Sequence, residues 1–410
     1  MGNIWKKGAL HTHTFWSDAN NLPEMIIHTY RDELKYDFVC ITEHNFFADK
    51  SMLYPVIRDR GPWPPQMSYE ELNRSIALLG NQIEHCRISS RRYVRLKSFD
   101  ELQRDWQIPG KFQLIGGCEL TTTWIKNGES HDIHLNAINC HRTIVPPIGD
   151  DGEKTMQACI DLYREACAGE THSSLLICNH PFWRYWDVDP RLLIAHPELK
   201  FMEICNNSDG INASDGIFTV DRYWDFVLAH RLDRGDGIIY TVASDDVHYG
   251  EPDKHHANGG FDNGWVMVKC PGEMTTGKLI SAMNNGDFYS SCGVYFDTIS
   301  FDPATRTLQV RIQAKPGQNY RIMFIVTRRD FDRQITEKYY PHDNPEHSRT
   351  LPVIPDSVGI CAEMVEGIEG SYTMTDDDLY VRAVAVADAP GYITGVFYPE
   401  TQRAWTQPFL

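Results

Sequence analysis

The sequence predicts a parallel α/β barrel followed by a small antiparallel β-domain. Up to about residue 296, short apolar runs typical of strands alternate with stretches of helical periodicity, and this alternation favours a parallel sheet. Seven or so strands over this length suit a barrel better than an open sheet. Beyond residue 296 the pattern becomes period-two alternation, as in Thr307–Ala314 and Leu379–Ala387, which is typical of antiparallel strands.

Within the barrel, short apolar runs predict the strands, and stretches of helical periodicity predict the helices. The predicted strands are Phe38–Thr42, Phe112–Ile115, Ile133–Asn139, Ser174–Cys178, Phe201–Cys205, Ile238–Ala243 and Trp265–Val268. The predicted helices between them are Pro23–Leu34, Tyr69–Cys86, Thr155–Cys167, Val220–Arg231 and Met274–Asn284. We therefore expect a barrel domain over 1–296, with an insertion at about 49–110, and a β-sandwich-like domain over 297–410.

Composition excludes several classes of protein. The net charge of −17 disfavours nucleic-acid binding, because an acidic surface repels phosphates. No apolar stretch is long enough to span a membrane, and no apolar core of a secretory leader follows Lys6 and Lys7. Eleven cysteines without a Cys-x-x-Cys pair suggest buried thiols in a reducing compartment, so we predict a cytoplasmic protein.

Histidines and carboxylates gather where the predicted strands end. Fifteen of the 17 histidines precede residue 297, and most of the ligand-type residues lie at or just beyond the C-terminal end of a strand. That end is where α/β barrels place catalytic groups. Isolated examples would be ordinary core residues or helix caps. Their recurrence predicts a metal centre, because burying imidazoles and carboxylates together is costly without a cation.

The ligand types constrain the metal. Imidazole and carboxylate without thiolate suit Zn²⁺, Mn²⁺ or Fe²⁺, and so many ligands are too many for one ion. We therefore expect two or three divalent ions, with a carboxylate such as Glu119 bridging two of them. The insertion at about 49–110 is expected near the mouth of this centre.

The ordered motif set resembles the PHP family, named for its polymerase and histidinol phosphatase domains. The resemblance spans nearly all of residues 8–250. It rests on His11-Thr12-His13 with Ser17-Asp18, Ile41-Thr42-Glu43-His44, Gly117-Cys118-Glu119, His134, Asn179-His180-Pro181 and Asp246-Val247-His248. It implies a distorted (β/α)7 TIM-like barrel with a two- or three-metal centre. The tail, through Ala404-Trp405-Thr406-Gln407-Pro408, is similar to a branch of the family that includes carbaryl hydrolases.

The resemblance also implies roles for individual residues. The first ion would be held by His11, His13, Glu119 and Asp246, the second by Glu119, His134 and His180, and the third by Asp18, His44 and His248. Glu43 stands where the family usually has aspartate. Two assignments compete with a neighbour: His131 with His134, and Asp245 with Asp246.

Three hypotheses for function follow. The first is hydrolysis of a small anionic phosphoester by metal-activated hydroxide, with His131 or Asp245 as a proton donor and Arg184 contacting the anion. The second is attack on a carbamate, carboxylic ester or amide carbonyl at the same centre, which the tail resemblance and nearby aromatic residues favour. The third is a non-catalytic binding protein, against which the complete ligand motifs argue.

Overall fold

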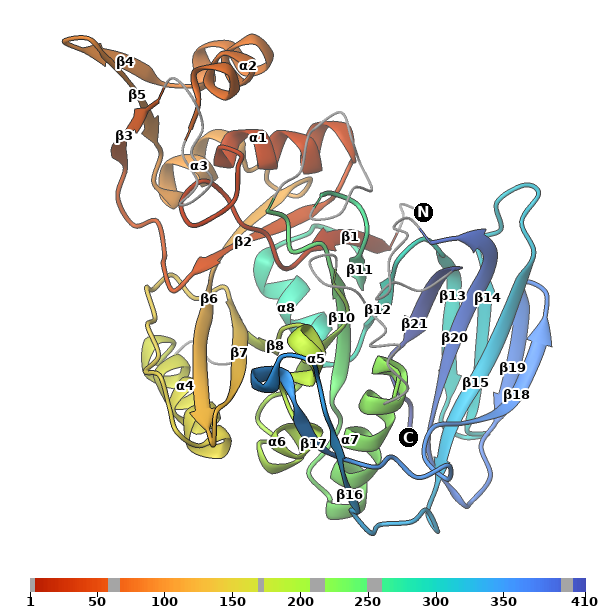
Figure 1. The fold of residues 1–410 in the computed structure, drawn as a ribbon. Coiled ribbons are helices and arrows are strands. Elements are labelled where there is room, and N and C mark those ends of the chain that lie inside the picture. Colours follow the sequence, from red (N-terminus) through yellow and green to blue (C-terminus); the bar gives the residue numbers. More distant parts are fainter. Residues whose placement is uncertain (1–3, 58–66, 169–172, 207–217, 249–259, 392–400) are drawn as a thin grey trace.

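The structure is a computed structural model, and it describes all residues except 1–3, 58–66, 169–172, 207–217, 249–259 and 392–400. One large mixed sheet runs through the molecule (Figure 1). Its strands lie in the order β10 (Tyr240–Ser244), β9 (Phe201–Asn206), β8 (Leu175–Cys178), β7 (Glu129–Ile138), β6 (Gln113–Lys126), β2 (Phe38–His44), β1 (Trp5–Ala9), β11 (Trp265–Lys269), β12 (Phe288–Ser291), β21 (Thr401–Thr406), β20 (Asp378–Pro390), β15 (Tyr320–Arg328) and β18 (Ile360–Glu366).

The prediction of a (β/α)7 TIM-like barrel is wrong, because this 13-stranded sheet is mixed rather than parallel. The pairs β10·β9, β9·β8, β6·β2 and β2·β1 are parallel, whereas β7 is antiparallel to both β6 and β8, and β11 is antiparallel to β1. The cause at β6 and β7 is local. Lys126 pairs with Glu129 around Asn127-Gly128, both at positive φ, which makes a two-residue hairpin turn instead of a helical crossover.

Helices cover this sheet and fill the connections between strands. They are α1 (Pro23–His28), continued by a π-helical turn at Thr29–Glu33, α3 (Phe99–Trp106), α4 (Gly152–Ala166), α5 (Trp183–Trp186), α6 (Pro190–Ala195), α7 (Val220–Arg234) and α8 (Thr276–Asn284). Among the described residues, no helix combines the length and apolarity needed to cross a membrane.

The segment predicted as an insertion carries its own small sheet and projects from the body (Figure 1). It contains β3 (Met52–Val56), α2 (Tyr69–Leu79), a 3-10 turn at Gly80–Gln82, β4 (His85–Ile88) and β5 (Arg91–Leu96). Ser68 begins α2 and Ser98 begins α3, each in a capping box with the glutamate three residues later.

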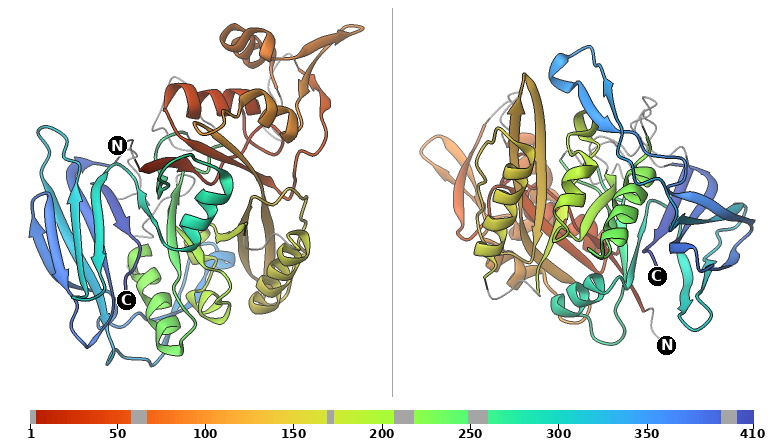
Figure 2. Two further views of the ribbon diagram at one scale, coloured as in Figure 1. Left: turned by 180° about the vertical axis from the view of Figure 1, so that it is seen from behind. Right: turned by 90° about the horizontal axis from the view of Figure 1, so that it is seen from below.

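The C-terminal strands extend the large sheet and add small ones. The small sheets are β13 (Phe296–Asp302), β14 (Thr307–Ile312) and β19 (Glu369–Thr373), and β16 (Glu337–Tyr340) with β17 (Arg349–Pro352), which follows a 3-10 turn at Pro345–His347. The views in Figure 2 place the C-terminal part of the large sheet, which includes β20, beside α7. One contact between them is a buried ion pair between Arg382 of β20 and Asp225 of α7, at 2.6 Å.

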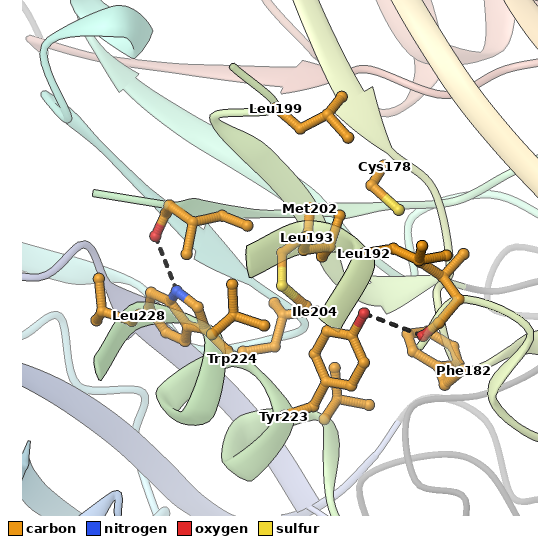
Figure 3. Packing of buried hydrophobic residues seen from close by; sticks show 14 of the residues in the cluster. Cys178, Phe182, Leu192, Leu193, Leu199, Met202, Ile204, Tyr223, Trp224 and Leu228 are labelled. Atoms are coloured by element: carbon orange, nitrogen blue, oxygen red, sulfur yellow. Dashed lines mark hydrogen bonds between the residues drawn. The ribbon is translucent and has the colours of Figure 1, made fainter. Parts of the chain in front are cut away.

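One part of the hydrophobic core is built by α7 packing on β9 (Figure 3). Met202 and Ile204 of β9 are fully buried against this helix. Trp224 donates its indole N–H to the carbonyl of Ile239, and Tyr223 donates its hydroxyl to the carbonyl of Val188. These bonds satisfy the polar atoms of two buried aromatic residues and fix the helix against the sheet.

Candidate metal centre

The segments that follow β1 and β10 are tied together by their backbones. The N–H of Asp246 donates to the carbonyl of His11 at 3.1 Å, and the N–H of His13 donates to the carbonyl of Val247 at 3.2 Å. Two motifs more than 230 residues apart in the sequence therefore lie side by side. Their side chains reach the same buried space.

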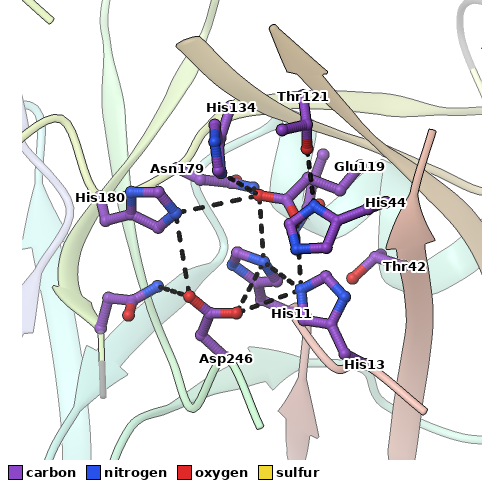
Figure 4. A network of polar contacts seen from close by, with 12 residues as sticks. His11, His13, Thr42, His44, Glu119, Thr121, His134, Asn179, His180 and Asp246 are labelled. Atoms are coloured by element: carbon purple, nitrogen blue, oxygen red, sulfur yellow. Dashed lines mark hydrogen bonds and ion pairs between the residues drawn. The ribbon is translucent and has the colours of Figure 1, made fainter. Parts of the chain in front are cut away.

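Two buried carboxylates form the middle of the cluster in Figure 4. Glu119, from within β6, has Oε2 at 3.2 Å from His13 Nε2 and 2.8 Å from His44 Nδ1. Its Oε1 lies 3.1 Å from His134 Nδ1. The second carboxylate, Asp246, contacts His11 and His13 on the other side. Glu119 thus lies among imidazoles from three different strands or loops.

The donor atoms of His11, His13 and Asp246 have the spacing of ligands around one ion. His11 Nε2, His13 Nε2 and Asp246 Oδ1 are each 3.1 Å from the other two. Tetrahedral ligands at zinc bond lengths lie about 3.3 Å from one another. This triangle therefore fits a small divalent cation.

Two buried acceptor atoms in the cluster lack a hydrogen bond. Within the described part of the chain, Glu119 Oε2 and Asp246 Oδ1 accept none, although imidazole nitrogens lie near both. An unsatisfied buried carboxylate oxygen is costly. A bound cation would supply the missing partner, so the residues present fit a metal ion.

Three groups of side chains in the described residues are compact enough to hold an ion. They are His11, His13 and Asp246; His44, Glu119 and His134; and His13, Asp18, His44 and His248. Eight of the nine predicted ligands are in these groups. The ninth, His180, lies at the edge of the cluster, with Nε2 at 3.8 Å from both Glu119 Oε1 and Asp246 Oδ2.

The charges in the cluster shift one another's protonation. Although burial opposes it, the carboxylates of Asp246, Glu119 and Glu203 hold the pKa of His11 well above its ordinary value. Burial likewise opposes but does not prevent a rise of the His248 pKa to about 9 beside Asp246 and Asp18. Nearby imidazoles hold the pKa of Glu119 well below its usual range, despite burial. The raised pKa values of His11 and His248 favour their protonated forms beside these carboxylates in the metal-free protein.

Two of the predicted ligands have an uncommon backbone conformation. His180 has φ of 21° and Asp246 has φ of 51°, in the region that favours glycine. Such conformations cost about 1–3 kcal/mol and persist where the surrounding structure enforces them. In both residues this backbone conformation directs the side chain toward the cluster.

The structure does not bring the predicted proton donors into this cluster. The ring of His131 stacks on Trp124 with centroids 4.0 Å apart, and burial lowers the pKa of His131 to about 3. Asp245 points the other way from Asp246: it accepts from the Tyr30 hydroxyl and from three backbone N–H groups of residues 262–264. The side chain of Arg184 lies outside the described part of the structure.

Other residues support the centre without being ligands. Glu43 accepts from the hydroxyls of Thr14 and Ser17, and so holds the turn that leads to Asp18. Asn179 donates to Glu119 Oε1 at 2.8 Å. Sequence reasoning gave no role to Glu203, which accepts a hydrogen bond from His11. The signal available was an acidic residue inside the apolar run Phe201–Cys205.

Comparison with known proteins adds no assignment to this geometry. No family model matches the chain, and no curated protein matches its sequence. The resemblance to the PHP family therefore stays a prediction. What the structure provides is a buried group of histidines and carboxylates that could hold metal ions.

Proposed function

We propose that this chain is a metal-dependent hydrolase that cleaves phosphoesters at a PHP-type centre of two or three divalent ions. The observation that carries the proposal is the position of Glu119, a fully buried carboxylate with imidazoles on both of its oxygens. A carboxylate in this position can bridge two ions, as two-metal hydrolytic sites require.

The compact groups indicate which residues would hold each ion. His11, His13 and Asp246 would hold the first, and His44, Glu119 and His134 the second. Asp18 and His248 would hold a third ion together with His13 or His44, which also belong to the first and the second group. Divalent ions bound there would acidify a coordinated water and neutralise charge on the phosphoryl oxygens.

The charge of the centre supports an anionic substrate. The ligand carboxylates Asp18, Glu119 and Asp246, together with the adjacent carboxylates of Glu43 and Glu203, carry five negative charges when ionised. Three divalent ions would exceed them, and the histidine ligands are neutral when they bind a metal. An excess of positive charge at the cluster would attract a phosphoester, even in a chain of net charge −17.

A second candidate is hydrolysis of a carbamate or carboxylic ester at the same centre. It is favoured by Trp183, whose partly exposed ring lies 5.1 Å from that of His134 and 5.3 Å from that of His180. An aromatic surface beside the ligands would suit an aryl leaving group.

A turnover screen separates these candidates. The purified chain is stripped of metal, reloaded separately with Zn²⁺, Mn²⁺ or Fe²⁺, and assayed with p-nitrophenyl phosphate, bis-p-nitrophenyl phosphate and 1-naphthyl esters of carbamic and acetic acid. We expect turnover of a phosphoester, its loss in His13→Ala, and its retention in His85→Ala on the exposed strand β4. Preference for the naphthyl esters would favour the second candidate. Absence of turnover with every metal would contradict both and favour a binding protein.

A further inference from the structure

Glu203 lies on β9 directly beside the metal centre but belongs to none of the three ligand groups. Its side chain is buried, with 1% exposed. Oε1 lies 2.8 Å from His11 Nδ1 and also accepts from the Ser244 hydroxyl. Oε2 accepts from the backbone N–H of His180 and from Asn206 Nδ2, both at 2.7 Å. All four neighbours of this carboxylate are donors.

These contacts determine which nitrogen of His11 is free. An ionised carboxylate only accepts hydrogen bonds, so His11 Nδ1 carries a proton. In the neutral ring Nε2 is then a bare lone pair. Nε2 is the atom that lies 3.1 Å from both His13 Nε2 and Asp246 Oδ1.

We propose that Glu203 is a positioning residue that fixes the metal-binding tautomer of His11; this inference rests on the proposed metal-dependent function. The same carboxylate aligns two more members of the cluster. Asn206 Nδ2, which donates to Glu203, also lies 3.2 Å from Asp246 Oδ2. The backbone bond from His180 helps to hold the uncommon conformation of that residue. Residues that orient metal ligands in this way typically change metal affinity 10- to 100-fold when replaced.

Replacement by glutamine tests the tautomer rather than the packing. The glutamine amide must turn its NH₂ either toward His11 and Ser244 or toward the His180 N–H and Asn206. The backbone N–H of His180 cannot become an acceptor, whereas the Ser244 hydroxyl can turn and His11 can move its proton to Nε2. Glu203→Gln is therefore expected to place its NH₂ against His11 Nδ1 and to leave the Nε2 of the neutral ring protonated, which blocks that ligand.

The experiment measures metal affinity, separately from catalysis. Zinc affinity and stoichiometry are measured by chelator competition for the wild type, Glu203→Gln, Glu203→Asp, Ser244→Ala and the control Glu198→Gln. Glu198 lies five residues earlier and pairs with Arg164 near the surface. In Glu203→Gln we expect zinc affinity to weaken about 10- to 100-fold at the site that includes His11. Glu203→Asp and Ser244→Ala should each lose less, and Glu198→Gln should bind as the wild type does.

A second measurement does not depend on whether these variants fold. In the zinc-loaded wild type labelled with ¹⁵N-histidine, the His11 signal, assigned by its loss in His11→Gln, should show a protonated Nδ1. A protonated Nε2, or equal zinc affinity in folded Glu203→Gln, would overturn the inference. If the wild-type protein bound no metal, that result would instead contradict the proposed function.

Discussion

Glu119 and His134 meet across an antiparallel strand pair, with His134 Nδ1 3.1 Å from Glu119 Oε1. In the register of β6 and β7, Thr121 is opposite His134 and Glu119 is opposite Asn136, so the two ligands are diagonal neighbours on one face. Both come from within long strands rather than from loops. The backbone hydrogen bonds between β6 and β7 continue on both sides of Glu119 and hold its carboxylate in place. A fixed position suits a carboxylate that contacts several imidazoles at once.

Replacing Glu119 should therefore disrupt more than one ion. In Glu119→Ala we expect both metal content and hydrolytic activity to fall, because Glu119 is the one carboxylate of the described residues that contacts His13, His44 and His134 together. Elemental analysis of the purified variant measures the metal content. Glu129→Ala, a half-buried residue at the start of β7 beside the hairpin turn, serves as the control. Full metal occupancy in Glu119→Ala would contradict the bridging role.

Asp18 should affect one ion selectively. Its carboxylate lies 3.3 Å from His248 Nε2 and 3.5 Å from His44 Nε2, on the side of the cluster away from His11. We expect Asp18→Asn to lose about one metal equivalent while the ions of the other two groups remain. Stoichiometry by elemental analysis tests this, and loss of all metal or of none would count against a separate third position.

The metal-free protein should become less stable as the pH rises. The pKa of His248 in the folded protein is raised to about 9, against 6.5 for a free histidine, so its stabilising contribution is complete below about pH 6.5 and is lost as the pH rises through 9. The shift corresponds to about 3 kcal/mol. Thermal unfolding with chelator from pH 6.5 to 9.5 should show a falling Tm, less steep in His248→Asn. A Tm that rises over this range would contradict the assignment.

Asp245 should be a structural residue despite its place in the motif. Its carboxylate accepts from the Tyr30 hydroxyl and from the N–H groups of Asp262, Asn263 and Gly264. Asp245→Asn turns an NH₂ toward fixed donors, so we expect a loss of roughly 2–4 kcal/mol in unfolding free energy. Chemical denaturation measures this loss, and elemental analysis should find the wild-type metal content. Normal stability with missing metal would reverse the roles of Asp245 and Asp246.

The sequence predicted which side chains gather in one cluster better than it predicted the fold. His11, Glu119 and Asp246 were identifiable because each motif is local, and they converge because neighbouring strands of one sheet carry them or lead to them. The strand order and directions could not be predicted in the same way, because the direction of a strand depends on the connections before and after it. The turn at Asn127-Gly128 is a hairpin signal, but the residues that flank it are mostly polar and lie outside the predicted strands Phe112–Ile115 and Ile133–Asn139.

Roles that depend on side-chain direction were also hidden. Asp245 and Asp246 are adjacent and chemically identical, and only the folded backbone turns one toward the imidazoles and the other toward Tyr30. His131 and His134 differ in the same way, since His131 stacks on Trp124. Glu203 could not be assigned from its own strand, because three of its partners come from the segment after β1, from β10 and from the segment after β8.

The most direct test is crystallographic: an anomalous difference map collected at the absorption edge of the metal with which the protein has been loaded. We expect separate peaks within the group of His11, His13 and Asp246 and within the group of His44, Glu119 and His134, with Glu119 contacting more than one ion. A loaded crystal whose map shows no peak among these side chains would contradict the account.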